Sequence, residues 1–470
     1  MEFYMRVENP SKYNRFCSLL QLYIKVNFFL LTDNESICKS FEFFLYLERF
    51  NINLFIMKAM YYFSLMMIIV LMGCSNDVDL GLRPKERMDI ELSRSEKVMA
   101  NENVDFSFRF FQQINQSTVN TPNLMVSPYS VSMALAMLAN GADTNTLAEI
   151  KDVLGFSEAD LDEMNSYFQR ITQTLLDLDN TTKLGITNSI WVDNDLTVYE
   201  SFRRVNEDMY DAKVGNIDFS NAQEANQTIN EWCAMQTNDL IKKPVSNLSP
   251  DVRMMLLNAL YFKGIWHKNN KFTKENTVAE NFTNADGNIV EVQMMNMEKE
   301  LNFAYNECFY MARFPYGNNA FCMTVYLPVE GMDLDNALKE LTYENWLQWS
   351  LKWSRRTLVV KFPKFEISTR RDLKDDLIAM GMEDAFDSQS ADFSALSSES
   401  LCLGLFKQDT YIKVDEEGTE AVAVTQSGGV ESAGPPSSGP VNFYLNRPFA
   451  FTINETSTNT VLFMGKVTEM

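Results

Sequence analysis

Histidine is almost absent from this chain of 470 residues, which has one, at position 267. Catalytic pairs of serine or cysteine with histidine need that residue in a defined setting, and histidine-based zinc sites need several of them. His267 lies between Trp266 and Lys268 and has no acidic neighbour, so we interpret it as an ordinary structural residue. The sequence therefore predicts no enzyme and no metal site, and nothing in it implies a cofactor.

Positive charge is also scarce relative to negative charge. The chain has 41 Lys and Arg residues against 63 Asp and Glu residues, a formal net charge of −22. Such a surface repels phosphate backbones, so we do not expect nucleic acid as a partner. Apolar residues make up 46% of the sequence, which is enough for a large core in one or two domains.

Closely spaced cysteine pairs are missing from the part of the chain that we expect to fold. Its four cysteines are scattered among apolar neighbours without CxxC spacing: Cys233, Cys308, Cys322 and Cys402. We expect buried free thiols there, because neither a disulfide framework nor a metal site has this spacing.

The N-terminal region contains the pattern of a lipoprotein signal peptide. Residues 1–56 show no sustained amphipathic period, and we interpret them as an upstream extension translated by mistake before a true start at Met57. Residues 57–73 have a basic start, an apolar run and Gly73 before Cys74, which resembles a bacterial lipobox. The apolar run is short for a spanning helix, although a single membrane anchor remains the alternative.

This resemblance implies that Cys74 is lipidated and becomes the mature N-terminus. Residues 74–95 are charged and poor in core residues, so we expect a flexible tether. Asp77 and Asp79 resemble the surface-export signals of some Gram-negative lipoproteins. We therefore expect a protein held by lipid at the bacterial outer membrane or cell surface.

A segment near the C-terminus has the pattern of a strand that could enter a packed sheet. Residues 415–425 contain a joint at Gly418, since glycine tolerates backbone angles that other residues avoid. Beyond the joint the side chains alternate with a period of two. One row is uniformly small: Thr419, Ala421, Ala423, Thr425 and Ser427. The other row is mixed and suits a solvent-facing side: Glu420, Val422, Val424 and Gln426. Residues 428–440 then have the composition of an exposed loop, so an edge strand followed by a linker is the alternative.

These residues, with Glu416 and Glu417 before them, resemble the hinge of the serpins, in which a cleaved loop inserts into a sheet. Further motifs similar to those of the family follow in the same order: Asn123–Ser130, Ile229–Trp232, Leu257–Trp266, Phe314–Gly317, Val325–Pro328, Phe362–Phe365, Asn446–Phe451 and Leu462–Val467. The resemblance implies an α+β fold with three β-sheets, about eight or nine helices and an exposed reactive-centre loop. We place a single serpin domain at residues 96–470, with the hinge and loop at 415–442.

The resemblance also implies two clusters of site residues. Beneath the central sheet, Ser127, Ser130 and Asn258 match a polar network in which many serpins have a histidine, and this chain has Gln408 instead. An amide can both donate and accept hydrogen bonds, so we expect the network to persist. A latch matches Glu416 with Lys364, close to Trp266.

The function implied by the resemblance is suicide-substrate inhibition of serine proteases by a monomer that has no catalytic residue of its own. Residues 418–442 contain no Lys, Arg, Phe, Tyr, Leu or Met, so trypsin-like and chymotrypsin-like pockets find no good residue. Counting from the hinge places the reactive bond at Ser432–Ala433, with Val430–Glu431 as second choice. Either bond suits an elastase-like or subtilisin-like protease that accepts small residues. A non-inhibitory serpin or a surface binding lipoprotein is the alternative.

Overall fold

The computed structural model describes residues 85–470 apart from 119–122, 238, 240 and 420–438. The predicted signal peptide and the first half of the predicted tether, residues 74–84 including Cys74, lie outside the described residues. The same holds for the hinge residues beyond Thr419 and for both candidate reactive bonds: Glu420, Ala421, Val422, Ala423, Val424, Thr425, Val430, Glu431, Ser432 and Ala433.

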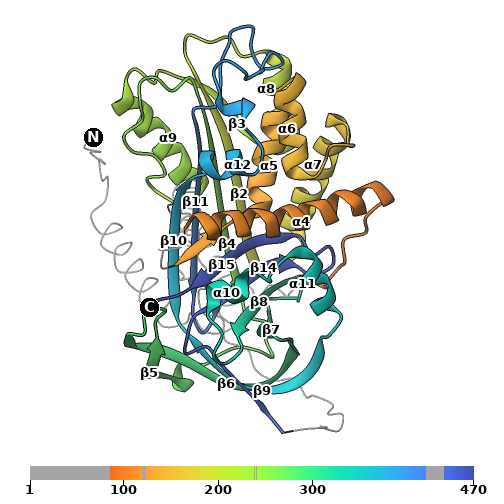
Figure 1. Cartoon of the computed structure of the whole chain (residues 1–470), viewed down its shortest axis with the longest axis vertical. Coiled ribbons are helices and arrows are strands. Elements are labelled where there is room, and N and C mark those ends of the chain that lie inside the picture. Colours follow the sequence, from red (N-terminus) through yellow and green to blue (C-terminus); the bar gives the residue numbers. More distant parts are fainter. Residues whose placement is uncertain (1–84, 119–122, 238, 240, 420–438) are drawn as a thin grey trace, which may run out of the picture. The chain divides into compact units, whose positions relative to one another are not determined.

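The described residues form nine α-helices, two 3-10 helices and fifteen strands, which agrees with the predicted α+β class (Figure 1). The helices are α4 Arg94–Ser117, α5 Pro128–Ala139, α6 Thr144–Leu154, α7 Leu161–Asp177, α8 Glu200–Tyr210, α9 Ala222–Gln236, α10 Leu334–Leu338, α11 Tyr343–Ser350, α12 Lys374–Ala379, η1 Lys274–Asn276 and η2 Asp384–Phe386. The strands are β1 Leu124–Val126, β2 Thr182–Asp193, β3 Lys213–Ile217, β4 Met254–Ile265, β5 Thr277–Thr283, β6 Ile289–Tyr305, β7 Phe309–Pro315, β8 Phe321–Pro328, β9 Ser354–Pro363, β10 Phe365–Asp372, β11 Leu405–Val414, β12 Gly418–Thr419, β13 Val441–Tyr444, β14 Phe449–Glu455 and β15 Val461–Val467.

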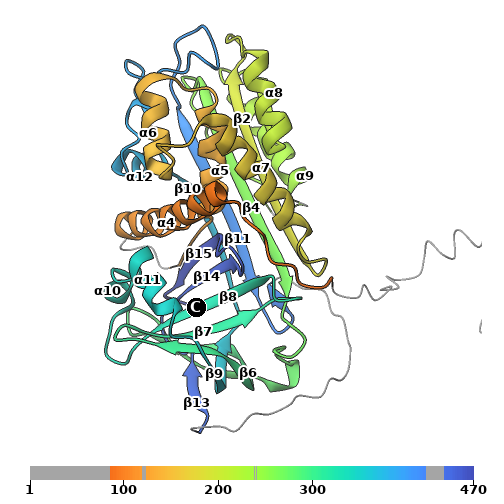
Figure 2. The same cartoon turned by 90° about the vertical axis from the view of Figure 1, so that its right-hand side faces the viewer.

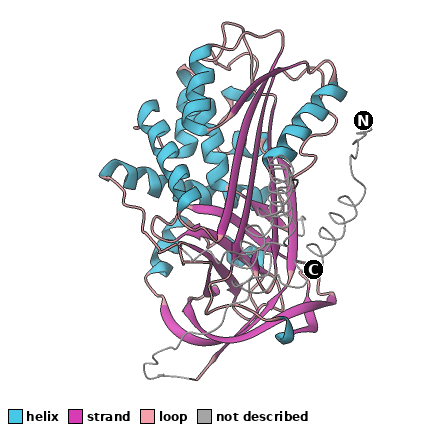
Figure 3. Cartoon of the chain, turned by 180° about the vertical axis from the view of Figure 1, so that it is seen from behind, coloured by secondary structure: helices cyan, strands magenta, loops and turns pink. Residues whose placement is uncertain are grey.

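The strands form one six-stranded and one nine-stranded sheet within the described part of the chain. The six-stranded sheet has the order β10-β11-β12-β4-β2-β3, and Figure 3 shows its long strands with helices packed around them. In the nine-stranded sheet, β6 is 17 residues long and pairs with β5, β7 and β9. Because this strand continues from one pairing region into the next, two of the three predicted sheets are joined by hydrogen bonds.

Helix α5 fills the centre of the molecule, and all of its residues are buried. Its sequence is almost wholly apolar, and it packs against β15 of one sheet and β4 of the other. Pro128 occupies the first turn, where its missing N–H leaves no bond unmade. Ser127 holds the N-cap position, but its side chain makes no capping hydrogen bond, so the cap that its residue type suggests is not formed.

The long strand β4 is buried along its first seven residues, which are apolar except for Asn258. The two C-terminal strands β14 and β15, which contain most of the last two family-like motifs, pair antiparallel. The four described cysteines are free thiols, and all but the half-buried Cys402 are buried.

The residues before α4 lie on the domain rather than apart from it. Lys85 and Ile90 make hydrogen bonds to residues far along the chain, and the Ile90 side chain belongs to the hydrophobic core. Figure 2 shows this segment leading from α4 toward the end of β4. Ser93 then begins α4 as one half of a capping box with Glu96. Among the helices of the described residues, none is long and apolar enough to cross a membrane.

Candidate functional site

The predicted hinge begins inside the six-stranded sheet. Gly418 and Thr419 form the short strand β12, which lies between the ends of β11 and β4. Thr419 pairs with Val414 on one side and Gly264 on the other, and both pairings are antiparallel. The hinge residue Thr419 is thus already hydrogen-bonded in the sheet at the point where the chain turns toward the loop.

Glycine is required at position 418 by both conformation and space. Its φ of +149° lies in a region that residues with a side chain rarely adopt. A Cβ at this position would lie 2.0 Å from the carbonyl oxygen of Gly264. The close approach of two backbones is what allows the chain to turn into the sheet here.

The Thr419 side chain is fully buried and faces the interior. Its Oγ1 lies 2.7 Å from the Tyr316 hydroxyl. The Tyr316 ring stacks on Trp266 with 4.6 Å between the ring centroids. Burial raises the pKa of Tyr316 well above its ordinary value, so this hydroxyl stays neutral and available for the hydrogen bond.

Trp266 holds the backbone of the hinge. Its indole Nε1 donates to the Asp415 carbonyl at 2.9 Å, and its backbone N–H donates to the Glu417 carbonyl at 2.8 Å. The tryptophan that the resemblance placed near the latch therefore contacts the main chain on both sides of Glu416. An indole N–H buried next to a carbonyl is a satisfied polar group, so this contact fixes the position of the turn.

The Glu416 carboxylate is bound by two partners. Lys364 Nζ lies 2.8 Å from its Oε2, and the Thr277 hydroxyl donates to its Oε1 at 2.8 Å. The Glu416 side chain is only 6% exposed, whereas that of Lys364 is 36% exposed. Burial by itself raises the pKa of Glu416, but the bonds from Lys364, the backbone and Thr277 outweigh it and hold the pKa below its ordinary range.

Below the hinge, β11 and β4 are direct neighbours. They pair in parallel from Leu405 with Met255 to Tyr411 with Tyr261. Beyond that point β12 separates them, so the two strands diverge to admit a third. The six-stranded sheet therefore has a seam between β4 and β11 that is open at one end.

Gln408 crosses beneath this seam. Its Nε2 donates to Asn258 Oδ1 and to the Ser127 carbonyl, both at 2.9 Å, and its Oε1 accepts from the Ser127 N–H at 3.1 Å. Asn258 Nδ2 donates to Ser130 through both the carbonyl and the hydroxyl of that residue. The amide at position 408 thus uses both its donor and its acceptor, as the sequence led us to expect of such a side chain.

Two atoms of this network have no protein partner among the described residues. They are the Ser127 hydroxyl and the side-chain nitrogen of Asn188. Asn188 belongs to β2, and its Oδ1 accepts from Asn258 at 2.6 Å. The network therefore spans β2, β4 and β11, so any widening of the seam must break part of it.

Asp409, the neighbour of Gln408, is a buried carboxylate on the same strand. Its Oδ1 accepts from Arg370 at 2.9 Å, and its side chain is 6% exposed. Its Oδ2 has no partner within the described part of the chain. Burial raises the pKa of Asp409 to about 6, against the opposing effect of Arg370.

Five residues of this site were not predicted from the sequence: Tyr316, Thr277, Asn188, Asp409 and Arg370. Tyr316 belongs to the motif Phe314–Gly317, but nothing in that motif links this residue to the hinge. Thr277 and Asn188 carried no local signal, because their partners lie 139 and 70 residues away. Among the residues that the structure describes, no three His, Cys, Asp or Glu side chains gather as metal ligands.

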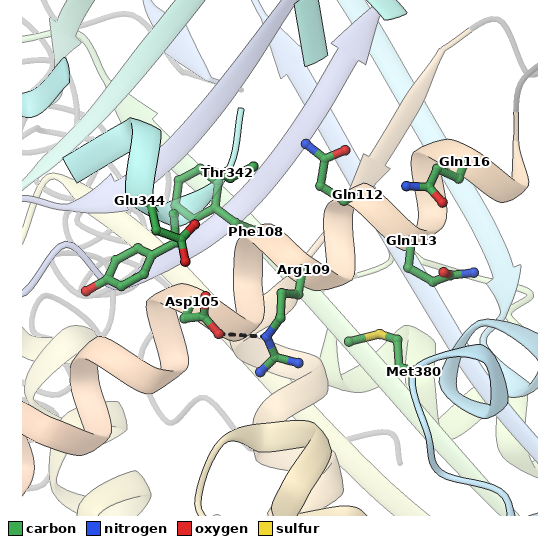
Figure 4. Close-up of a pocket in the computed structure, with 10 residues that line it drawn as sticks. Asp105, Phe108, Arg109, Gln112, Gln113, Gln116, Thr342, Glu344 and Met380 are labelled. Atoms are coloured by element: carbon green, nitrogen blue, oxygen red, sulfur yellow. Dashed lines mark hydrogen bonds and ion pairs between the residues drawn. The ribbon is translucent and has the colours of Figure 1, made fainter. Parts of the chain in front are cut away.

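A groove of about 390 Å³ lies elsewhere, between α4 and the start of α11 (Figure 4). Gln113 and Gln116 of α4 line it beside the Asp105–Arg109 ion pair, and Met380 forms part of its wall. These polar residues recur on one side of an amphipathic helix, which is typical of a solvated face.

Comparison with known proteins gives a consistent result. The family described as "Serpin (serine protease inhibitor)" matches residues 101–470. Human Serpin B3 is 33% identical over 390 residues, which cover 78% of this chain and 98% of that protein. Tengpin, a thermophilic serpin solved in its native state, is 30% identical with a TM-score of 0.72, covering 84% of this chain and 99% of that one. Human thyroxine-binding globulin in complex with thyroxine is 27% identical with a TM-score of 0.73, covering 80% and 99%.

Proposed function

The chain belongs to the serpin family, and from this premise we propose that it is a suicide-substrate inhibitor of serine proteases with elastase-like or subtilisin-like specificity. In the proposed reaction the protease serine attacks a carbonyl of the loop and forms an acyl-enzyme, releasing the new amino terminus of the loop. The freed hinge strand then extends β12 along the seam and carries the attached protease with it. The chemistry is that of the protease, and this chain supplies the conformational change.

The observation that carries the proposal is the direction of the three strands at the seam. β4 and β11 are parallel to each other, and β12 is antiparallel to both. Extending β12 would replace one parallel pairing with two antiparallel pairings, which are slightly more stable per residue. The seam therefore favours insertion of a strand in the direction in which the hinge already points.

The free energy needed to distort the trapped protease is large compared with the stability of an ordinary domain. Slowing deacylation about a millionfold needs roughly 8 kcal/mol of distortion in the protease. Each net hydrogen bond of a new strand contributes about 1 kcal/mol, so a strand of about ten added bonds has the right magnitude. The predicted row of small side chains that begins with the buried Thr419 suits such a strand.

Family membership alone does not decide between inhibition and another function, since one relative is solved in complex with thyroxine. The hinge supports inhibition, because large or charged residues in its inner row would oppose burial. A non-inhibitory serpin or a surface binding lipoprotein would be cleaved in the loop, or left intact, without trapping a protease.

Incubation with pancreatic elastase and with trypsin, followed by a denaturing gel, tests the proposal. We expect a covalent complex with elastase, and mass spectrometry of the released peptide should place the cut at Ser432–Ala433 or, as second choice, at Val430–Glu431. Complete loop cleavage without a complex would show that the protein is not an inhibitor of this enzyme class. A trypsin complex cut after Arg447, with no elastase complex, would refute the proposed specificity.

We also propose that the mature protein is a monomer anchored by lipid at Cys74 to the bacterial outer membrane or cell surface. The lipobox pattern at residues 71–74 supports this. Ten residues separate Cys74 from Lys85, the first described residue. At most about 3.5 Å per residue, this short connection would keep the domain close to the surface that holds the lipid.

A further inference from the structure

The residues before α4 bind the domain at the end of the sheet where the hinge enters. We call residues 85–90 the strap. Lys85 donates its backbone N–H to Asn180 Oδ1 at 2.9 Å, and its Nζ lies 2.6 Å from the Asp177 carboxylate. Both partners lie at or beside the connection between α7 and β2. This end of the strap is therefore bonded to the connection that leads directly into β2.

The strap is also bonded to two turns of the nine-stranded sheet. Asn318, between β7 and β8, donates to the Lys85 carbonyl at 3.1 Å. Ser457, between β14 and β15, accepts from the Ile90 N–H at 2.9 Å. The Ile90 side chain is 8% exposed and lies in the core. One short segment thus connects the start of β2 to two turns of the other sheet.

The end of β4 has its own attachment to the same region. Gly317 donates to the Ile265 carbonyl at 2.8 Å, and Trp266 forms a bridge with Tyr316. A single attachment at the end of β4 would leave the paired strands β2 and β4 free to pivot about it. Two further attachments, one strand away at the connection into β2, oppose that rotation. Asn318 Nδ2 donates directly to the Leu178 carbonyl at 2.9 Å, and the strap adds the bonds of Lys85.

Such a rotation is what loop insertion demands. β4 and β11 must separate by one strand spacing, about 4.8 Å, to admit another strand. β2 must move with β4, because the two pair from Thr182 with Gly264 to Val192 with Met254. We propose that the strap restrains opening of the seam by fixing the start of β2 to the β7–β8 and β14–β15 turns. This inference rests on the loop-insertion step of the proposed function.

The strap differs from the surface contacts near it. Arg87 forms an ion pair with Asp89, two residues along, and both side chains are exposed. The Lys85–Asp177 ion pair is also open to solvent, with 33% and 84% of the two side chains exposed, so the charge itself contributes little. The restraint comes from the backbone bonds of Lys85 and from the Ile90 anchor.

The test compares two deletions in the full chain. The first removes residues 85–89 of the strap, and the matched control removes five residues of the predicted tether, 76–80. Each protein is heated below its unfolding temperature, and spontaneous loop insertion is followed as loss of cleavage in the loop and a higher midpoint of urea unfolding. We expect the strap deletion to insert about fivefold faster, the effect of one net hydrogen bond of about 1 kcal/mol, and the control to insert at the original rate.

A second variant shows whether the strap acts through the link described here. Ser457→Ala removes the acceptor of the Ile90 N–H at the other end of the strap and should also accelerate insertion. Combined with the strap deletion it should add nothing, because both changes break one link. Arg87→Ala should leave the rate unchanged.

Three outcomes would overturn the proposal: equal rates for the two deletions, multiplied effects in the combined variant, or no insertion at any temperature in either protein. None of these measurements depends on the trapping of a protease in a covalent complex. A full chain that inserts faster without its strap, but forms no complex with elastase, would refute the proposed inhibition and leave the restraint standing.

Discussion

The Tyr316 hydroxyl lies 2.7 Å from Thr419 Oγ1, and both side chains are fully buried. Tyr316 belongs to the turn after β7, and Thr419 is the last described residue before the loop. This hydrogen bond therefore joins a turn of the nine-stranded sheet to β12, the residue pair from which the proposed inserted strand would extend. A side chain at position 419 must fit a space already defined by the Tyr316 ring and Gly264.

Thr419→Arg should convert the protein from an inhibitor into a substrate. Burying a guanidinium in place of a small hydroxyl costs several kcal/mol, so insertion slows while the protease still cleaves the loop. The stoichiometry of inhibition, measured on denaturing gels, should rise sharply. Glu420→Arg, a change in the row predicted to face solvent, is the matched control and should leave the stoichiometry near its original value. Normal trapping by Thr419→Arg would refute the inward orientation during inhibition.

Glu416→Lys should promote spontaneous insertion or polymer formation on mild heating, because it places two cations together and removes the carboxylate that accepts from Thr277. Glu417→Lys makes the same charge change at a side chain for which the described contacts include no ion pair, so it serves as the control. Native gels and light scattering after heating would separate the two. A monomeric, fully active Glu416→Lys protein would remove the latch from the mechanism.

We also expect the free energy of unfolding to fall in acid because of the Glu416 carboxylate. The pKa of Glu416 is lowered in the folded state, so its contribution is present above the unfolded value of about 4.3 and is lost as pH falls through the folded pKa. Lys364 is partly exposed, which limits the contribution to about 1 kcal/mol. Urea unfolding between pH 3 and 7 should therefore show a smaller acid loss in Glu416→Gln. An unchanged pH profile in this variant would contradict the assignment.

We expect Asp409 to give the opposite dependence of stability on pH, in a higher pH range. Its folded pKa of about 6 lies above the value of about 3.9 expected in the unfolded chain. Its stabilising contribution is thus fully present below about pH 4 and is lost as pH rises through about 6. Asp409→Asn should flatten stability between pH 4 and 7, whereas Glu366→Gln, at an exposed carboxylate of β10, should not. Identical profiles for the two variants would show that Asp409 ionises as it does in the unfolded chain.

Cys74→Ser should abolish lipid attachment and leave the precursor unprocessed or the protein in the soluble fraction. Metabolic labelling with a fatty acid and cell fractionation would measure this. Globomycin, which blocks lipoprotein signal peptidase, should cause the original protein to accumulate as a precursor. Mature protein that begins near Met1 with an unmodified Cys74 would contradict the anchor.

Much of the fold could be predicted because its motifs are local. Strand β4 has a mostly apolar sequence that is interrupted by Asn258, and the C-terminal strands β14 and β15 are two nearby apolar segments. The predicted α+β class is confirmed. The continuation of β6 from one pairing region to the next was not predictable, because the sequence has no marker for where a strand changes partners.

Residues of the site could be predicted only where they lie in motifs that resemble those of the family. Glu416 and Lys364 were paired through their motifs, but Thr277 was not, because a threonine at the start of an edge strand has no distinctive pattern. The strap was missed for a related reason. Its polar composition suggests a tether, and its attachment depends on backbone bonds to Asn180 and Asn318 that composition does not reveal.

The parallel pairing of β4 with β11 has a consequence for how such a protein would be used by a cell. An inserted strand occupies the whole length from Leu405 to Tyr411, and no step of the proposed reaction removes it. Each molecule would therefore act once, against one protease molecule. Protection would then scale with the number of copies made and exported, so the rate of protein synthesis, rather than any turnover number, would set how large a burst of proteolysis the cell withstands.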